Sequence, residues 1–307
     1  MNELDLLIFQ HTHEPIAIKE LTKKIHLSVA QKTVYTSIYR LEKEGLLTTK
    51  KQGKNLLIQQ SPQPVSAYLH TILETQPHLI KKHIFSTTSL HILLTLLHDI
   101  LTVKRITEIN HLSERNTRRH LSKLHKAAVI IKQKDHSTPH TYIWEINKLQ
   151  REILQFLEAY EEFRAFKISK SIDANASLLW VHGIEFLIKT PQPVHQKHFT
   201  KTGTAVLNQY GMKLLSTEHI YLYTKRTLDL WDHAFLMVLS RKNDANQLRY
   251  LAYLYKKHKP DPTEFLQKGT YYDPQSMHLV SDFFLKNKET PQLTRKDITE
   301  LERLYGV

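Results

Sequence analysis

The spacing of apolar residues predicts three short helices and a β-hairpin within the first 60 residues. Two short amphipathic patterns precede Ser28, which we expect to cap a third helix. In that helix Val34, Ile38 and Leu41 form one apolar stripe at helical spacing. Gly45 should end it, and "LLTTKKQGKNLLIQQ" then alternates like two strands around a polar turn.

The same order of elements recurs about 83 residues later in the chain. Leu90–Leu97 predicts a first helix, and the second ends in the His-Leu-Ser triplet that also stands at His26–Ser28. "ERNTRRHLSKLHKAAV" predicts the third helix, and "IIKQKDHSTPHTYIWEI" a longer hairpin. A slide of 83 residues also matches basic residues, placing Arg115 on Lys32, Lys123 on Arg40 and Lys126 on Lys43. Repetition at this length predicts two tandem copies of one module.

Three helices followed by a β-hairpin are the layout of a winged helix-turn-helix domain. We therefore expect a mainly α protein with small β-hairpin wings, in which two tandem winged helix-turn-helix domains precede an α-rich α+β C-terminal domain. The predicted boundaries are 1–60 and 88–147 for the two modules, 61–87 for a connector, 148–170 for a linking helix and 171–307 for the last domain. The apolar face of the linking helix can bridge domains or pair with its twin in a homodimer.

In the last domain, apolar spacing predicts helices at "TGTAVLNQYGMKLL", "RTLDLWDHAFLMVLS", "NQLRYLAYLYKK", "TEFLQKGTYYD", "SMHLVSDFFLK" and "RKDITELERLY". "HIYLYT" has the composition of a strand. The domain should therefore contain strands but be dominated by helix.

Net charge points to an anionic partner. The chain has 43 Lys and Arg against 30 Asp and Glu, a formal charge of +13. Within Thr102–Lys134 alone there are 9 basic and 2 acidic residues, so much of the excess lies around the third helix of the second module. The chain has no cysteine, no signal-peptide pattern and no apolar run of membrane-spanning length. We expect a cytoplasmic protein without a membrane partner.

Helical geometry separates the two faces of that third helix. At about 100° per residue, Thr117, Leu121, Leu124 and Ala128 share the core face. Arginines near the N-terminus of a recognition helix can bind guanine with two hydrogen bonds, asparagine can bind adenine, and lysines more often hold phosphates. The candidate DNA-binding residues of the two helices and hairpins are Lys32, Thr33, Thr36, Arg40, Lys50, Lys51, Lys54, Arg115, Asn116, Arg118, Arg119, Ser122, Lys123, Lys126, Lys132 and Lys134. Of these, Arg118 lies on the flank and suits a phosphate or a carboxylate better than a base.

Residues 1–60 and 88–147 resemble the winged helix-turn-helix transcription regulators of archaea and bacteria. The later segments "ASLLWVHGIEFL", "YLYTKRTLDLWDHAFLMVLSR" and "DPTEFLQKGTYYD" resemble the C-terminal domain of AbiEi-type antitoxins, with Arg226, Leu228 and Asp229 in the place of an Arg-x-Leu-x-Asp helix start. That family usually carries one winged helix, whereas two are expected here. The second resemblance implies promoter autoregulation and a partner toxin of the nucleotidyltransferase type.

The sequence therefore predicts a transcription regulator that binds double-stranded DNA and needs no cofactor. An antitoxin that binds its toxin through the C-terminal domain and a replication initiator of plasmid or viral type are alternatives. Enzyme motifs are missing: the chain has no Walker loop, Gly-x-Ser-x-Gly or nucleotidyltransferase Gly-Ser motif. The spaced His pairs at His11–His13 and His195–His198 lack a nearby third ligand, so we expect no metal site. Capping or core hydrogen bonds explain the polar residues of the last domain better than catalysis: His182, Glu185, Asp229, Asp232 and His233.

Overall fold

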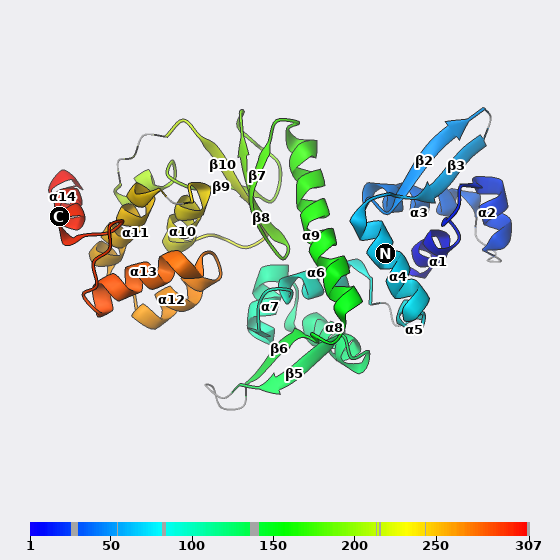
Figure 1. Cartoon of the computed structure of the whole chain (residues 1–307), viewed down its shortest axis with the longest axis horizontal. Helices are drawn as coiled ribbons and strands as arrows, with labels where there is room; N and C mark the ends of the chain where they lie inside the picture. The colour runs from blue at the N-terminus through cyan, green and yellow to red at the C-terminus, as the bar shows by residue number, and fades with distance from the viewer. Residues whose placement is uncertain are drawn as a thin grey trace. The chain divides into compact units, whose positions relative to one another are not determined.

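The computed structural model describes residues 1–25, 30–53, 55–81, 84–135, 141–212, 214, 216–242 and 244–305. Over these residues the chain is a mixed α and β protein, with helices and small antiparallel sheets (Figure 1). It divides into two compact units. Unit 1 comprises Met1–Lys167 and His182–Ile184, and unit 2 comprises Ile168–Val181 and Glu185–Val307. Among the described residues, no helix is long and apolar enough to cross a membrane.

The first 60 residues of unit 1, here called module 1, pack three helices against a small sheet. Their elements are α1 (Glu3–Gln10), β1 (Ile16–Ala17), α2 (Ile18–Lys24), α3 (Gln31–Lys43), β2 (Leu47–Gln52) and β3 (Asn55–Gln60). The strands are ordered β1-β3-β2. Asn2 starts α1 through a reciprocal capping box with Asp5. The predicted cap Ser28 lies outside the described residues, and α3 begins after Ala30.

Residues 88–147, here called module 2, repeat this arrangement. The corresponding elements are α6 (Thr87–Thr95), β4 (Leu101–Thr102), α7 (Val103–Asn110), α8 (Glu114–Lys126), β5 (Ile130–Lys134) and β6 (Tyr142–Ile146). Their strand order, β4-β6-β5, matches that of module 1. Helices α3 and α8 each span 13 residues and start 83 residues apart, which agrees with the slide read from the sequence. The two-residue strands β1 and β4 were not predicted, because so short a segment has no periodicity.

The connector between the modules contains two helices, α4 (Pro64–Thr75) and α5 (His78–Lys81). The linking helix is α9 (Arg151–Ile172). Its residues Ile153, Phe156 and Leu157 are fully buried, and the Phe85 ring meets Phe156 edge to face. Leu149 instead lies before the helix and is 88% exposed. Unit 1 therefore buries the first turns of the apolar face of α9.

Unit 2 contains a four-stranded sheet in the order β7-β8-β10-β9. The strands are β7 (Ser177–His182), β8 (Glu185–Thr190), β9 (Phe199–Lys201) and β10 (His219–Tyr223). In the antiparallel pair β8 and β10, Ile188 faces Tyr221. The helices are α10 (Leu230–Ser240), α11 (Ala245–His258), α12 (Pro262–Thr270), α13 (Pro274–Leu285) and α14 (Arg295–Tyr305). Their predicted positions are confirmed, as is that of the predicted strand, β10.

One predicted helix of unit 2 is wrong. The described residues of "TGTAVLNQYGMKLL" form only a short 3₁₀ helix, η1 (Leu207–Tyr210), and positions 213 and 215 lie outside the described residues. Gly203 and Gly211 on either side of it have φ angles of +75° and +83°. These left-handed conformations interrupt an α-helix, so the apolar spacing between them could not extend into regular turns.

Candidate nucleic-acid interface

Helix α8 is positioned by a side-chain cap and a buried stripe. The Ser113 hydroxyl accepts a hydrogen bond from the Asn116 backbone N–H (3.3 Å), which satisfies one free donor of the first turn. Thr117, Leu121 and Leu124 are fully buried, as predicted for the core face. Ala128, predicted on the same face, is exposed, because it lies beyond the C-cap at a φ angle of +58°. Helical spacing no longer applies at that position.

His120 also belongs to the buried side of α8. Its Nδ1 lies 3.0 Å from the Ser89 hydroxyl of α6, and its side chain is almost fully buried. Burial lowers the pKa of His120, and the neighbouring charges of Arg119 and Lys123 lower it further. The imidazole is therefore neutral at pH 7, and packing of α8 against α6 buries no charge at this position.

The opposite side of α8 carries exposed cations. Arg115, Arg119, Lys123 and Lys126 are all exposed. Arg119 donates to the Asn116 Oδ1 (3.0 Å), a contact that holds its guanidinium over the first turns of the helix. Within the described part of the chain, Arg115, Lys123 and Lys126 make no ion pair. This face can therefore bind an anion without first breaking an internal salt bridge.

Arg118 and Ser122 complete the exposed side of α8. Both Nε (2.9 Å) and Nη2 of Arg118 donate to the Oε1 of Glu114, one turn earlier. This agrees with the expectation that Arg118, on the flank, suits a carboxylate. Ser122 is exposed between the cationic positions.

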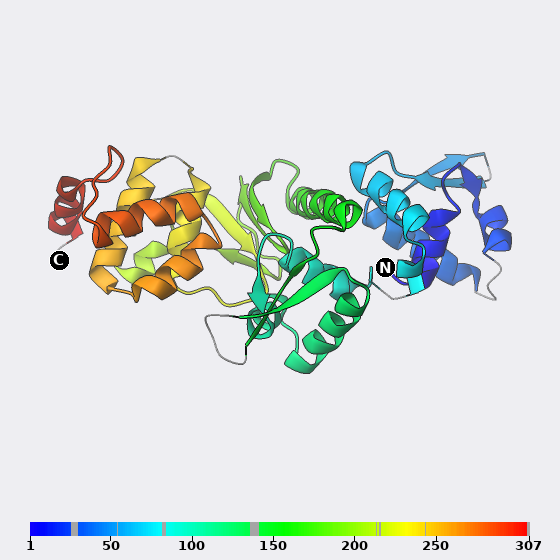
Figure 2. The same cartoon turned by 60° about the horizontal axis from the view of Figure 1, so that its bottom comes forward.

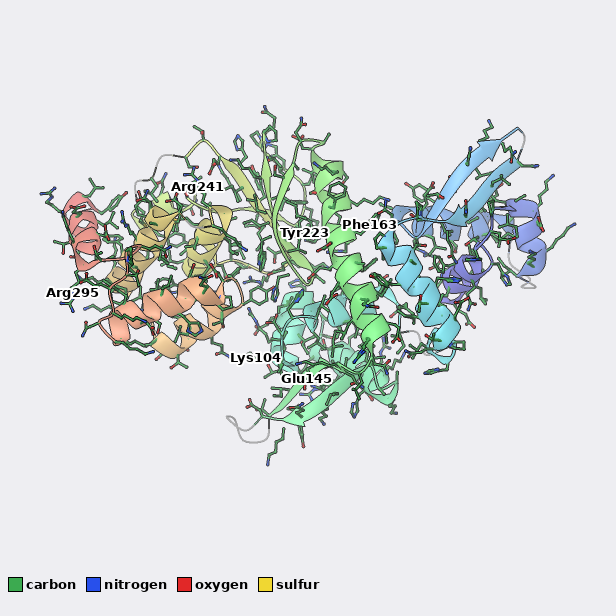
Figure 3. The ribbon with its side chains drawn as sticks, in the orientation of Figure 1. Lys104, Glu145, Phe163, Tyr223, Arg241 and Arg295 are labelled. Carbon is green, nitrogen blue, oxygen red and sulfur yellow. The ribbon has the colours of Figure 1, made fainter. Side chains whose placement is uncertain are left out.

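The β5–β6 hairpin runs back beside α8 (Figure 2) and presents Lys132 and Lys134, which are both exposed. The Lys132 ammonium lies 3.7 Å from the centre of the Tyr142 ring and 5.7 Å from that of Trp144. These cation–π contacts hold the ammonium while leaving its outer side open. Sequence reasoning missed Lys104, which is exposed on α7 (Figure 3).

Module 1 presents fewer available cations at its equivalent positions. Lys32, Thr33 and Thr36 are exposed on α3, and Lys50 and Lys51 are exposed on β2. Lys54 lies outside the described residues. The remaining predicted residue of this module, Arg40, is already engaged inside it. Its Nη2 donates to the buried Asp5 carboxylate (2.6 Å) and to the Ser37 hydroxyl (3.2 Å).

Two aromatic residues of α3 were also missed in the sequence. Tyr35 is 45% exposed and Tyr39 is 67% exposed. Their signal is visible in "TVYTSIYR", since both fall off the apolar stripe of Val34, Ile38 and Leu41.

Several polar residues of unit 2 do converge, around the buried Arg226. Its Nε and Nη2 donate to the two oxygens of Glu185 (2.9 and 3.1 Å), and its Nη1 donates to Asp232 (2.8 Å). The Tyr271 and Tyr272 hydroxyls donate to Glu185 (3.0 Å) and Asp232 (2.6 Å). Burial alone would raise the pKa of Asp232, but Arg226 and Lys268 outweigh it and hold that pKa well below its usual value.

Polar residues of this region also cap a helix and form core hydrogen bonds. Asp229 and Asp232 form the capping box that starts α10, and the His233 Nδ1 lies 2.9 Å from the Thr202 hydroxyl. His182 does not join the group and instead contacts Asp99 (2.5 Å), within unit 1. Arg226, Glu185 and Asp232 are buried and mutually paired, and Asp229 caps α10, so core hydrogen bonding and capping account for these groups.

Among the described residues, no group of three or more histidine, aspartate or glutamate side chains could hold a metal ion. Exposed cations gather on one side of α8 and on the β5–β6 hairpin beside it, and this surface is the candidate site that the geometry supports best. No protein-family model matches the sequence, and no curated protein is similar enough to it to count as a match.

Proposed function

We propose that the chain is a transcription regulator that binds double-stranded DNA sequence-specifically, and that modules 1 and 2 act as winged helix-turn-helix domains. One observation carries the proposal: α8 exposes Arg115, Arg119, Lys123 and Lys126 on the side opposite its buried stripe. A helix with this distribution fits the major groove, whose floor offers hydrogen-bond acceptors and whose walls are phosphates.

The positions along α8 suggest separate roles. Arg115 and Arg119 lie in the first half of the helix, where recognition helices meet base edges, and each can bind a guanine with two hydrogen bonds. Asn116 supports Arg119 through its Oδ1. Lys123 and Lys126 lie farther along the helix and suit phosphates, which fix register rather than sequence.

Neighbouring elements supply further phosphate contacts in this proposal. Lys132 and Lys134 extend from the β5–β6 hairpin, the element that serves as the wing. Lys104 stands at the start of α7, the helix that precedes the recognition helix and crosses the DNA backbone in such domains. The alternative is a basic surface that only contacts solvent. The segment Thr102–Lys134, however, has 9 basic and only 2 acidic residues, and this concentration of positive charge favours an anionic partner.

The test is DNase footprinting and fluorescence anisotropy on the DNA upstream of the chain's own gene, at two salt concentrations. We expect a protected site whose affinity falls steeply with salt, because every neutralised phosphate releases counterions. Replacing Arg115 and Arg119 together by alanine should weaken specific binding by about 2–6 kcal/mol, or about 1–3 kcal/mol for each lost guanine contact. Binding to unrelated duplex should change much less.

A matched control removes the same charge from unit 2. Arg295 and Arg303 are exposed on α14, so Arg295→Ala with Arg303→Ala also lowers the net charge by two. This variant should bind like the wild type. If the α8 double variant retains full specific affinity, α8 is not the reading helix. If the wild type shows no salt-dependent DNA binding, the modules are protein-docking domains instead.

A further inference from the structure

The outward sides of α3 and α8 differ in chemistry although the two helices match in length and place. At the positions where α8 has Arg118 and Ser122, α3 has Tyr35 and Tyr39. The position of Arg119 in α8 is taken by Thr36 in α3. The exposed side of α3 therefore carries two aromatic rings where that of α8 carries Arg118 and Ser122.

Tyr39 stands near the centre of the exposed side of α3. At about 100° per residue it projects within about 40° of both Lys32 and Lys43, opposite the buried stripe. Tyr35 precedes it by one turn, so the two rings occupy neighbouring places on the helix surface. Within the described part of the chain, neither ring stacks on another ring or makes a hydrogen bond.

This combination of groups matches a particular feature of duplex DNA. In the major groove, thymine is marked by its C5-methyl group, which apolar side chains contact. A tyrosine ring supplies an apolar surface for the methyl and a hydroxyl that can reach a polar neighbour. Lys32 and Lys43, nearer the two ends of α3, and Lys50 and Lys51 on β2 are exposed and complement the surrounding phosphates. The lysines favour DNA over an uncharged apolar partner.

We infer that module 1 reads thymine methyl groups through Tyr39, with Tyr35 beside it, while module 2 reads guanines through Arg115 and Arg119. The inference rests on the proposed function and deepens it. The full binding site then consists of two chemically different halves, one marked by thymine and one by guanine. Two identical half-sites are not expected, even though the modules share one fold.

The experiment selects duplexes from a random-sequence library with the full chain. The wild type should enrich a site with a thymine-containing half and a guanine-containing half. Tyr39→Ser should lose the preference for thymine in the first half alone, whereas Tyr39→Phe should keep it, because the ring is retained. Arg115→Ala with Arg119→Ala should lose the guanine preference in the second half alone.

Replacing the selected thymines by deoxyuridine removes only their methyl groups. For the wild type we expect about a fourfold loss of affinity per contacted methyl, the value of burying one such group. Tyr39→Ser should bind the thymine and deoxyuridine duplexes equally. Thermal melts check that each variant is folded. We expect the Tyr39 variants to fold because the Tyr39 side chain is exposed and takes no part in the core.

The outcomes separate this inference from the proposed function. If the wild type enriches a sequence but is indifferent to deoxyuridine, or enriches two identical halves, the inference is overturned and the proposed function stands. If it enriches no sequence at all, both fail.

Discussion

Removal of Arg226 tests whether the buried ionic cluster stabilises unit 2. The Arg226, Glu185 and Asp232 side chains are 9%, 1% and 2% exposed, so water cannot replace a lost partner. Arg226→Met keeps much of the side-chain volume but leaves Glu185 without a cation. Breaking a buried ion pair on one side costs about 3–5 kcal/mol, because the remaining charge is desolvated and unpaired.

The structure places the expected loss at the lower end of this range. Asp232 keeps Lys268, whose Nζ lies 2.9 Å from its Oδ2, and Glu185 keeps hydrogen bonds from Thr224 and Tyr271. We therefore expect a loss of about 3 kcal/mol in the free energy of unfolding of unit 2. Adding Glu185→Gln to Arg226→Met should recover part of this loss, because the uncompensated carboxylate is then neutral.

Urea unfolding followed by tryptophan fluorescence measures the effect. The chain has three tryptophans, and Trp144→Phe leaves Trp180 and Trp231, which both belong to unit 2. In this background Arg241→Met is the control, since the Arg241 side chain is 47% exposed and loss of its ion pairs should lower the free energy of unfolding by at most about 1 kcal/mol. If the two variants unfold at the same urea concentration, the cluster contributes no more than a surface ion pair.

Two further predictions concern unit 1. A hydrogen bond to Glu161 raises the pKa of His98 and outweighs the opposing effect of burial. The free energy of unfolding of unit 1 should therefore fall as pH rises above about 6.5. His98→Gln should flatten this dependence in urea melts at different pH values. Gly45→Ala should lower the free energy of unfolding by more than the roughly 1–2 kcal/mol of a left-handed residue, because its Cβ would fall 2.0 Å from the Phe163 ring of α9 (Figure 3). Gly53→Ala, with open space around its Cβ, should lose roughly 1–2 kcal/mol alone. Equal melting temperatures for the two glycine variants would contradict the packing argument.

The helices and their faces could be predicted because the information is local. The stripes on α3 and α8 follow from a period of 3.6 residues, and the 83-residue slide needs only two matching stripes. The prediction failed where the backbone leaves the helix, at Ala128 and around η1. Positive φ angles at Ala128, Gly203 and Gly211 end the helical periodicity there, and the spacing of apolar residues does not indicate these angles.

The partners of charged residues could not be predicted, because they come from distant parts of the chain. Arg226 and Glu185 are 41 residues apart and meet only after α10 packs near the sheet of unit 2. Arg40 meets Asp5 across 35 residues. Spacing identifies which side of a helix a charge occupies, but not whether another element has already neutralised it.

Arg40 and Lys123 show why a basic match between the modules does not imply a shared role. In module 1 the Arg40 guanidinium donates both to Asp5 on α1 and to Ser37 on its own helix. In module 2 the equivalent contact between α6 and α8 joins Ser89 to His120, at the position that Ser37 occupies in α3. The first helix supplies a carboxylate in one module and a hydroxyl in the other. Lys123 is exposed on α8 and makes no ion pair among the described residues, whereas Arg40 is committed to the packing of α1 against α3. The two modules therefore differ on their outer sides partly because of one residue in their cores.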